Sequence, residues 1–173
     1  MTTTTLGELT GDYVLDTVRT RIGFVAKHTM ATRVPGNFQT FEGRAHLDGD
    51  DPSRSTVDVT IQAASIQTRN PRRDEALRDK FLDVANHPTI TFTSTEVEQV
   101  DDATFAVTGD LTIRGTTNPV TIAFTLTGDN DRLTLRGTVP INRRDWGVHW
   151  VAAGFLVTKQ VLLDLDATAT RRP

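Results

Sequence analysis

Apolar residues recur at every second position over most of this sequence, which is the pattern of half-buried β-strands. The first clear case starts at Ile22, because Ile22, Phe24, Ala26 and His28 share one face of an expected strand. The alternation is cleanest over residues 56–63, where valine and isoleucine alternate with polar side chains. The chain also holds 30 threonines, and β-branched side chains favour an extended backbone. The sequence therefore predicts an all-β protein.

Turn signals divide this pattern into about eight strands. The expected strands cover residues 22–28, about 37–47, 56–63, 89–98, 104–113, 120–127, 133–141 and 161–167. The turns between them are rich in Gly, Asp, Asn and Pro, as at 48–52, 101–102, 115–119 and 128–131. Many strands with short connections are typical of an antiparallel sandwich or barrel. On the strand 120–127, Ile122 and Phe124 are expected to point inward, and Thr121 and Thr125 outward.

One segment has a helical pattern instead. Asn70-Pro71 is a good helix start, and Leu77, Phe81 and Val84 then recur at helical spacing. We expect a helix over residues 71–84 that lies on the sheet as a lid or plug. With no linker in view, residues 1–173 are expected to form one domain, ordered over about 11–170, with frayed ends at 1–9 and 171–173.

Composition excludes several classes of function. The 19 Lys and Arg against 22 Asp and Glu give a net charge of -3, so nucleic acid is not an expected partner. The absence of Cys rules out disulfides and thiolate metal sites. The N-terminal stretch resembles no secretory signal, which predicts a cytoplasmic location, and no run is long enough for a transmembrane helix. Homodimers are the commonest symmetric assembly, which leaves a homodimer open.

Polar side chains form no strong catalytic or metal-binding pattern. His28, His46, His87 and His149 lack the spacing of a metal site, so no cofactor or metal is expected. The run 143–147 (Arg-Arg-Asp-Trp-Gly) has two interpretations: a grip on a polar or anionic head group, or a structural barrel corner. Arg73-Asp74 has the same two, and the structural interpretation is favoured for both.

A closed sheet of about eight strands is just wide enough to be filled by side chains or to hold one small ligand. The inward candidates are mostly aromatic or aliphatic, so any cavity should be long and apolar. By strand register, the candidate ligand-binding residues of the lumen are Ile22, Phe24, Ala26, His28, Phe38, Phe92, Phe105, Leu111, Ile122, Phe124 and Trp146.

A series of motifs runs in order along the chain from about Tyr13 to Ala167. The motifs are Tyr13-x-x-Asp16, Ile22-x-Phe24 with Lys27-His28, Gly36-x-Phe38-x-x-Phe41-x-Gly43, Ile66-x-Thr68, Arg73-Asp74, Phe81-Leu82-Asp83, residues 87–94 (HPTITFTS), residues 109–115 (GDLTIRG) with Pro119-Val120, and Arg144-Asp145-Trp146-Gly147. Together they resemble the YceI-like family, the polyisoprenoid-binding proteins with a lipocalin-like barrel.

The resemblance implies an extended antiparallel barrel that sequesters an amphiphile with a long isoprenoid or acyl tail, such as a quinone or its precursor. Family members usually carry a His-Ser pair after the opening Asp, where this chain has Thr17-Val18-Arg19. They often carry a His before the helix Leu, where this chain has Ala76. Roles of those His residues are therefore not transferred, and the family supplies no catalytic residues.

Three functions remain open at this point. The leading one is a non-enzymatic carrier that holds a long-tailed hydrophobic small molecule, with His28 at the strand end placed for a head group. The second is an enzyme on a small hydrophobic or isoprenoid-derived substrate, using His149 or His28 with Asp145 as an acid–base pair. The third is a fully packed barrel that acts through its surface.

Overall fold

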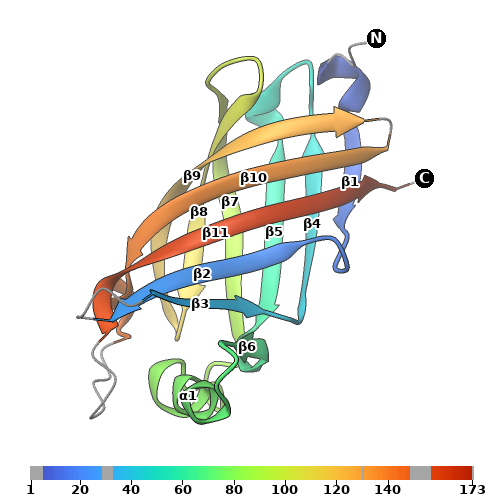
Figure 1. The fold of residues 1–173 in the computed structure, drawn as a ribbon. Helices are drawn as coiled ribbons and strands as arrows, with labels where there is room; N and C mark the ends of the chain where they lie inside the picture. Colours follow the sequence, from blue (N-terminus) through green and yellow to red (C-terminus); the bar gives the residue numbers. More distant parts are fainter. Residues whose placement is uncertain (1–5, 29–32, 130, 149–156, 173) are drawn as a thin grey trace.

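The computed structural model describes residues 6–28, 33–129, 131–148 and 157–172, which form eleven β-strands and several short helical segments (Figure 1). The strands are β1 (Gly11–Leu15), β2 (Arg21–His28), β3 (Arg33–Phe38), β4 (Phe41–Leu47), β5 (Thr56–Gln62), β6 (Ile66–Gln67), β7 (Thr89–Gln99), β8 (Thr104–Ile113), β9 (Thr116–Asp129), β10 (Arg132–Asn142) and β11 (Val157–Arg171). The helical segments are η1 (Leu6–Leu9), η2 (Pro52–Arg54), η3 (Ala63–Ser65), α1 (Pro71–Ala76), η4 (Leu77–Phe81) and η5 (Arg143–Trp146). None of these helical segments has the length and apolar character needed to cross a membrane.

Eight strands close into an antiparallel barrel. Their hydrogen-bonded order is β1, β4, β5, β7, β8, β9, β10 and β11, and β11 returns to β1. The closing contact is short, running from Tyr13 opposite Arg171 to Leu15 opposite Ala169. The prediction of an antiparallel barrel of about eight strands with one short helix is confirmed.

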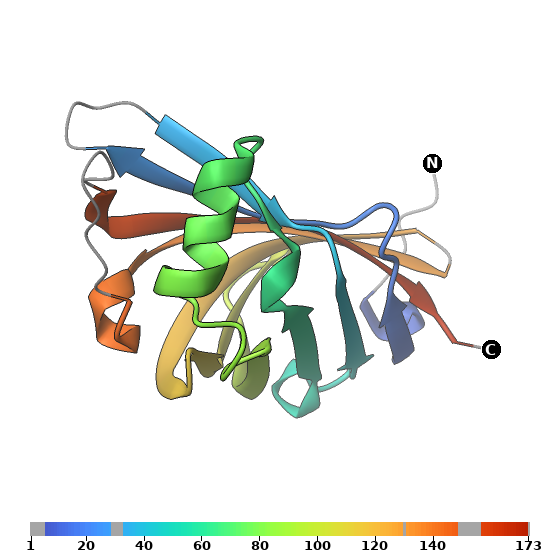
Figure 2. The same cartoon turned by 90° about the horizontal axis from the view of Figure 1, so that it is seen from below.

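The remaining strands extend the wall on the other half of β11. β11 pairs with β2 from Val157 to Asp166, β2 pairs with β3, and β3 pairs with β6. β6 leads into α1 and η4, which lie across this end of the barrel (Figure 2). This lid packs against the barrel core through Leu77, Phe81 and Leu82.

The alternation seen in the sequence sets the two faces of the wall. On β9, Ile122 is buried and Phe124 half-buried, whereas Thr121 and Thr125 are exposed, as predicted. Threonines also bond across neighbouring strands on the outer face: the Thr108 and Thr121 hydroxyls lie 2.7 Å apart. Threonine therefore covers much of the outer face of the wall, whereas aliphatic and aromatic residues line its inner face.

Two of the expected boundaries are wrong. The strand expected at 37–47 is broken, because β3 ends at Phe38 and β4 starts at Phe41. Between them the chain changes partner around η3: the Gln39 N–H donates to the Ser65 carbonyl, and the Gln62 N–H donates to the Thr40 carbonyl. The turn expected at 115–119 is only Arg114-Gly115, both with positive φ, and β9 starts at Thr116. Pro119 fits in β9 because the described pairing with β10 covers only the far end of that strand.

The helix is shorter than the predicted 71–84. Asn70 caps it as expected, since its side chain accepts from the Arg73 N–H. The α-helical part ends at Ala76 and continues as a π-helical turn, in which the Leu82 N–H donates to the Leu77 carbonyl. Asp83, with a φ of 48°, then turns the chain away.

The N-terminal residues also differ from the expectation of a frayed end. Leu6–Leu9 form a 3-10 turn in which Leu9 is buried, with 4% of its surface exposed. Leu9 belongs to a second apolar cluster at the barrel end opposite the lid, together with Tyr13, Leu47, Leu133 and Ala169.

Candidate functional site

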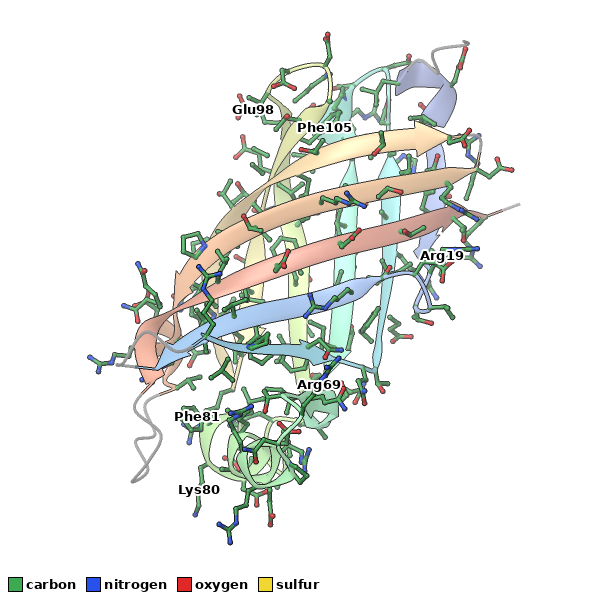
Figure 3. All side chains as sticks on the ribbon, viewed as in Figure 1. Arg19, Arg69, Lys80, Phe81, Glu98 and Phe105 are labelled. Atoms are coloured by element: carbon green, nitrogen blue, oxygen red, sulfur yellow. The ribbon has the colours of Figure 1, made fainter. Side chains whose placement is uncertain are left out.

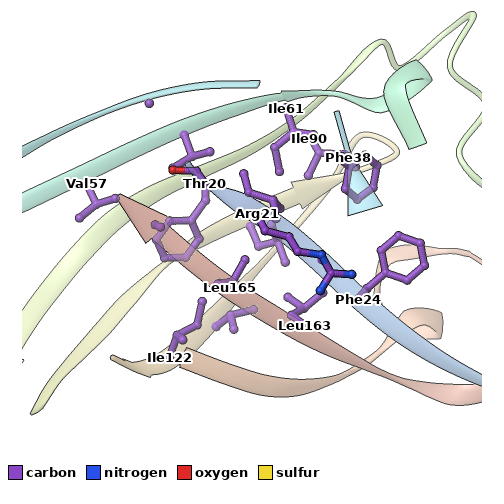
Figure 4. Close-up of a pocket in the computed structure, with 18 of the residues that line it drawn as sticks. Thr20, Arg21, Phe24, Phe38, Val57, Ile61, Ile90, Ile122, Leu163 and Leu165 are labelled. Carbon is purple, nitrogen blue, oxygen red and sulfur yellow. The ribbon is translucent and has the colours of Figure 1, made fainter. Parts of the chain in front are cut away.

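The barrel encloses a cavity lined mainly by apolar side chains (Figure 4). Its volume, measured as the space open to the centre of a water molecule, is about 340 Å³. The wall draws on every strand of the ring and on the lid. Among its residues are Leu15, Val34, Leu47, Val57, Val59, Ile61, Leu77, Phe81, Leu82, Ile90, Val97, Val107, Val120, Leu126, Leu133, Leu135, Ile141, Val161, Leu163, Leu165 and Ala169.

The residues selected from the sequence as lumen residues gather around this cavity. All of them line it except His28, whose side chain lies outside the described residues. Phe24 and Phe38 meet on adjacent strands with ring centroids 5.7 Å apart (Figure 4). The contribution of each residue to ligand binding stays a prediction.

Other wall residues were missing from that selection. The cavity is also lined by Val57, Val59 and Ile61 of β5 and by Leu163 and Leu165 of β11. The signal that finds them is the same period of two, because each of these strands alternates apolar and polar residues. The lid residues that face the cavity, such as Leu82, could not be found this way, since their facing depends on where the helix docks.

Arg73 and Asp74 hold the start of the lid in place. The Thr68 N–H and hydroxyl both donate to Asp74 Oδ1, at 2.8 and 2.5 Å. Arg73 in turn donates from Nε to the Thr68 hydroxyl at 2.7 Å and from Nη2 to the Thr68 carbonyl at 2.8 Å. Asp74 is buried. This favours the structural interpretation of the pair, which ties α1 to the strand before it.

The run 143–147 forms a barrel corner at the lid end. Trp146 is 3% exposed and donates from Nε1 to the Leu111 carbonyl at 2.7 Å. Gly147 has a φ of 75°, a left-handed conformation that favours glycine, and its carbonyl accepts from Arg114. Arg143 packs its guanidinium over the Phe81 ring, 6.0 Å from the centroid, and donates to the Val148 carbonyl. The structural interpretation again holds, with one addition: Arg143 also lines the cavity.

Arginine residues also border the cavity. They are Arg21 of β2, Arg44 of β4, Arg73 of α1 and Arg143 of η5, and the last two lie at the lid end. Burial, and secondarily the neighbouring Arg144 charge, lower the pKa of Arg143. Figure 3 shows Phe81 on the lid against the barrel and Lys80 directed away from it, in agreement with their burial. A tail in the lumen would meet hydrocarbon.

The acid–base pairs considered from the sequence stay a prediction, because the His28 side chain and all of His149 lie outside the described residues. Asp145, the shared partner, is exposed. His46 contacts Asp12 at 2.8 Å, but both side chains are largely exposed on the outer surface. Among the described residues, no group of His, Asp and Glu is arranged to hold a metal ion, and every buried polar side-chain atom has a partner. What the described geometry supports chemically is the removal of an apolar chain from water.

Comparisons with known proteins agree with this geometry. A family model described as a YceI-like domain matches residues 13–169. A UPF0312 protein of Ectopseudomonas mendocina is 32% identical over 149 residues, covering 81% of this chain and 78% of the relative. A UPF0312 protein of Pseudomonas aeruginosa strain LESB58 is 37% identical over 134 residues, covering 73% and 70%.

Solved structures share the fold. BcnA of Burkholderia cenocepacia superposes with a TM-score of 0.85 at 23% identity, over 90% of this chain and 99% of its own. A polyisoprenoid binding domain from Saccharophagus degradans gives a TM-score of 0.76 at 15% identity, over 92% and 98%. A Campylobacter jejuni YceI protein gives 0.75 at 25% identity, over 85% and 90%. At these identities, the first two establish the architecture alone.

Proposed function

Since the chain belongs to the YceI-like family, we propose that it binds, without catalysis, an amphiphile with a long isoprenoid or acyl tail. The observation that carries the proposal is the cavity, which is enclosed by aliphatic and aromatic side chains from all around the barrel. A further support is that a solved relative of the same fold is a polyisoprenoid binding domain.

The physical driving force is the transfer of the tail out of water. Burial of apolar surface contributes roughly 25 cal/mol per Å², so a tail that hides a few hundred Å² gains several kcal/mol before ordering costs. Each buried methylene should add about 0.8 kcal/mol until the barrel is full. The buried polar side-chain atoms of the described residues already have hydrogen-bond partners, so they select little between tails of different chemistry. The length and width of the tail should therefore decide its affinity.

The head group is proposed to lie at the lid end. Arg73 and Arg143 border the cavity there, and a guanidinium group suits an anionic or strongly polar oxygen-bearing group. A quinone precursor with a polar ring would satisfy the same arrangement. His28, at the strand end that faces the described start of β11, is a second candidate contact for the head.

The direct experiment is to purify the protein without an affinity tag, extract it with organic solvent and analyse the extract by mass spectrometry. A co-purifying lipid, recovered unchanged, supports the carrier. Conversion of an added quinone or prenyl compound into a product would instead support the enzyme.

A titration with straight-chain amphiphiles of increasing length then tests the cavity itself. Ala26→Phe should penalise long chains more than short ones, because Ala26 is buried and lines the lumen. Ala123→Phe is the matched control, since Ala123 is exposed on the outer face of β9. Affinity that is independent of tail length, with no difference between the two variants, would show that the lumen binds nothing and that the function is elsewhere.

A further inference from the structure

The barrel end opposite the lid is closed by the N-terminal turn η1. It packs against Gly49, in the turn after β4, and against Gly128, near the end of β9. A Cβ at Gly49 would stand 1.9 Å from the Leu6 carbonyl oxygen, and one at Gly128 would stand 2.3 Å from Leu9 Cδ1. Both distances are far below van der Waals contact, so η1 lies this close only because both positions are glycine. The turn η1 therefore packs closely against the end of the barrel.

Hydrogen bonds from Tyr13 and Arg171 hold η1 against the barrel. Tyr13 is 1% exposed, and its hydroxyl donates to the Leu9 carbonyl at 2.6 Å. Arg171 donates to the same hydroxyl from Nε at 3.3 Å and Nη2 at 3.0 Å, and from Nη2 to the Glu8 carbonyl at 2.8 Å. Its guanidinium carbon lies 5.6 Å from the Tyr13 ring centroid. We call Leu6, Leu9, Tyr13 and Arg171 the end knot.

The cavity extends up to this knot. Leu47, Leu133 and Ala169 line the cavity, and the same three residues form one buried cluster with Leu9 and Tyr13. Leu9 and Tyr13 are therefore the layer directly behind the cavity wall. The contacts here are hydrocarbon, which suits the terminal carbons of a tail.

The surroundings of the knot are acidic. Asp48, Asp50 and Asp51 follow β4, and Asp129 and Asp131 flank the turn between β9 and β10. Gly7 of η1 faces the Asp50 carboxylate, at 3.0 Å from a Cβ built on that glycine. These carboxylates outnumber the neighbouring cations Arg132, Arg171 and Arg172, and Arg171 Nε lies 3.9 Å from Asp131 Oδ1. The remaining negative charge disfavours an anionic head group but not an uncharged chain end.

We propose that the end knot is the stop that sets the longest tail the barrel accepts, with Leu9 as its specificity-determining residue. The proposal rests on the proposed binding function and adds to it the position of the blind end. A chain that reaches the wall at Leu133 and Ala169 can gain no further burial, because the knot behind that wall is packed and hydrogen-bonded in place. Longer chains must leave carbons in water at the other end.

The test is a homologous series of straight-chain alcohols, lengthened two carbons at a time and titrated by displacement of a fluorescent fatty probe. In the wild type, affinity should rise about fourfold per methylene up to a ceiling. Leu9→Ala removes three side-chain carbons behind the wall, so the ceiling should move to chains longer by about two methylenes, which would then bind more than tenfold tighter than to the wild type. Ala169→Leu fills the same end and should lower the ceiling.

Leu162→Ala is the matched control, because Leu162 lies on the outer face of β11 and is 40% exposed. Thermal unfolding followed by circular dichroism shows which variants are folded; if Leu9→Ala does not fold, the downward shift in Ala169→Leu decides. Wild-type protein that binds none of the alcohols refutes the proposed function itself. Wild-type protein with a clear ceiling that neither folded variant moves, or that Leu162→Ala moves equally, refutes the end stop alone.

Discussion

A substitution at Gly36 should narrow the lumen indirectly. Gly36 contacts the ring of Phe24, and that ring lines the cavity. The two residues are opposite each other on β2 and β3. A Cβ on Gly36 would lie 2.3 Å from Phe24 Cζ, 2.8 Å from Cε2 and 2.9 Å from Cε1. The ring therefore lies flat on the glycine, and all three close atoms belong to a side chain that can move.

In a Gly36→Ala variant the ring has to shift. Carbon atoms pack at about 3.5–4.0 Å, so Phe24 must move by roughly 1.2–1.7 Å, and its open side is the cavity. Overpacking of this kind costs about 1–3 kcal/mol, offset by about 0.5–1 kcal/mol because alanine restricts the unfolded chain. The expected net loss of stability is about 0–2.5 kcal/mol. The ring also enters the path of the tail beside Phe38, so affinity for long-tailed amphiphiles should fall.

Denaturant midpoints and the tail-length titration measure the two effects. Val25→Ala is the control: Val25 neighbours Phe24 on β2, is half-buried and is not among the residues that line the cavity. This variant should leave the titration unchanged. If Gly36→Ala binds every chain length as the wild type does while remaining folded, then the ring does not move into the lumen and the reasoning from these distances is wrong.

Three further predictions concern the wall, a turn and the histidines. Phe124→Ala should lower the free energy of unfolding by about 2 kcal/mol, less than the roughly 3–5 kcal/mol of a fully packed Phe, because one side of the ring meets the cavity. Thr125→Ala should be nearly neutral. Equal losses in denaturant midpoint from the two variants would contradict the register. Hydrogen bonds from the Ala103 N–H and, to a smaller extent, from the Thr104 side chain hold the pKa of Asp101 below its ordinary value. The stability that this carboxylate adds is therefore present at neutral pH and lost in acid. Asp101→Asn should flatten that part of the pH dependence of the denaturant midpoint. Elemental analysis of untagged protein should find no stoichiometric zinc, nickel or copper, and a metal that disappears on replacing His28 or His149 would overturn this.

Strand-by-strand facing was predictable because it is a local property. In an extended chain, alternate side chains take opposite faces whatever the partner strand is, so Ile122 inward and Thr121 outward follow from the order of residues alone. The cap at Asn70 was predictable for the same reason, since the Arg73 N–H that donates to its side chain lies within three residues. The corner at 143–147 was visible as a run of unusual residues, but its two interpretations could be separated only when Trp146 was seen to bond the Leu111 carbonyl on another strand.

The sequence by itself thus determined the type of element, the inward residues of each strand and the apolar character of any lumen. The tertiary structure alone decided that the sheet closes through the short β1–β11 contact, that the chain changes partner at Gln39 and Thr40, and that residues 6–9 form part of the barrel end. The physical reason is sequence separation. Tyr13 and Arg171 are joined across a separation of 158 residues, and Leu9 is buried only because Gly128 leaves room for it. Local periodicity carries no information on such contacts, so an N-terminal turn with one buried leucine resembles a frayed end until the barrel is assembled around it.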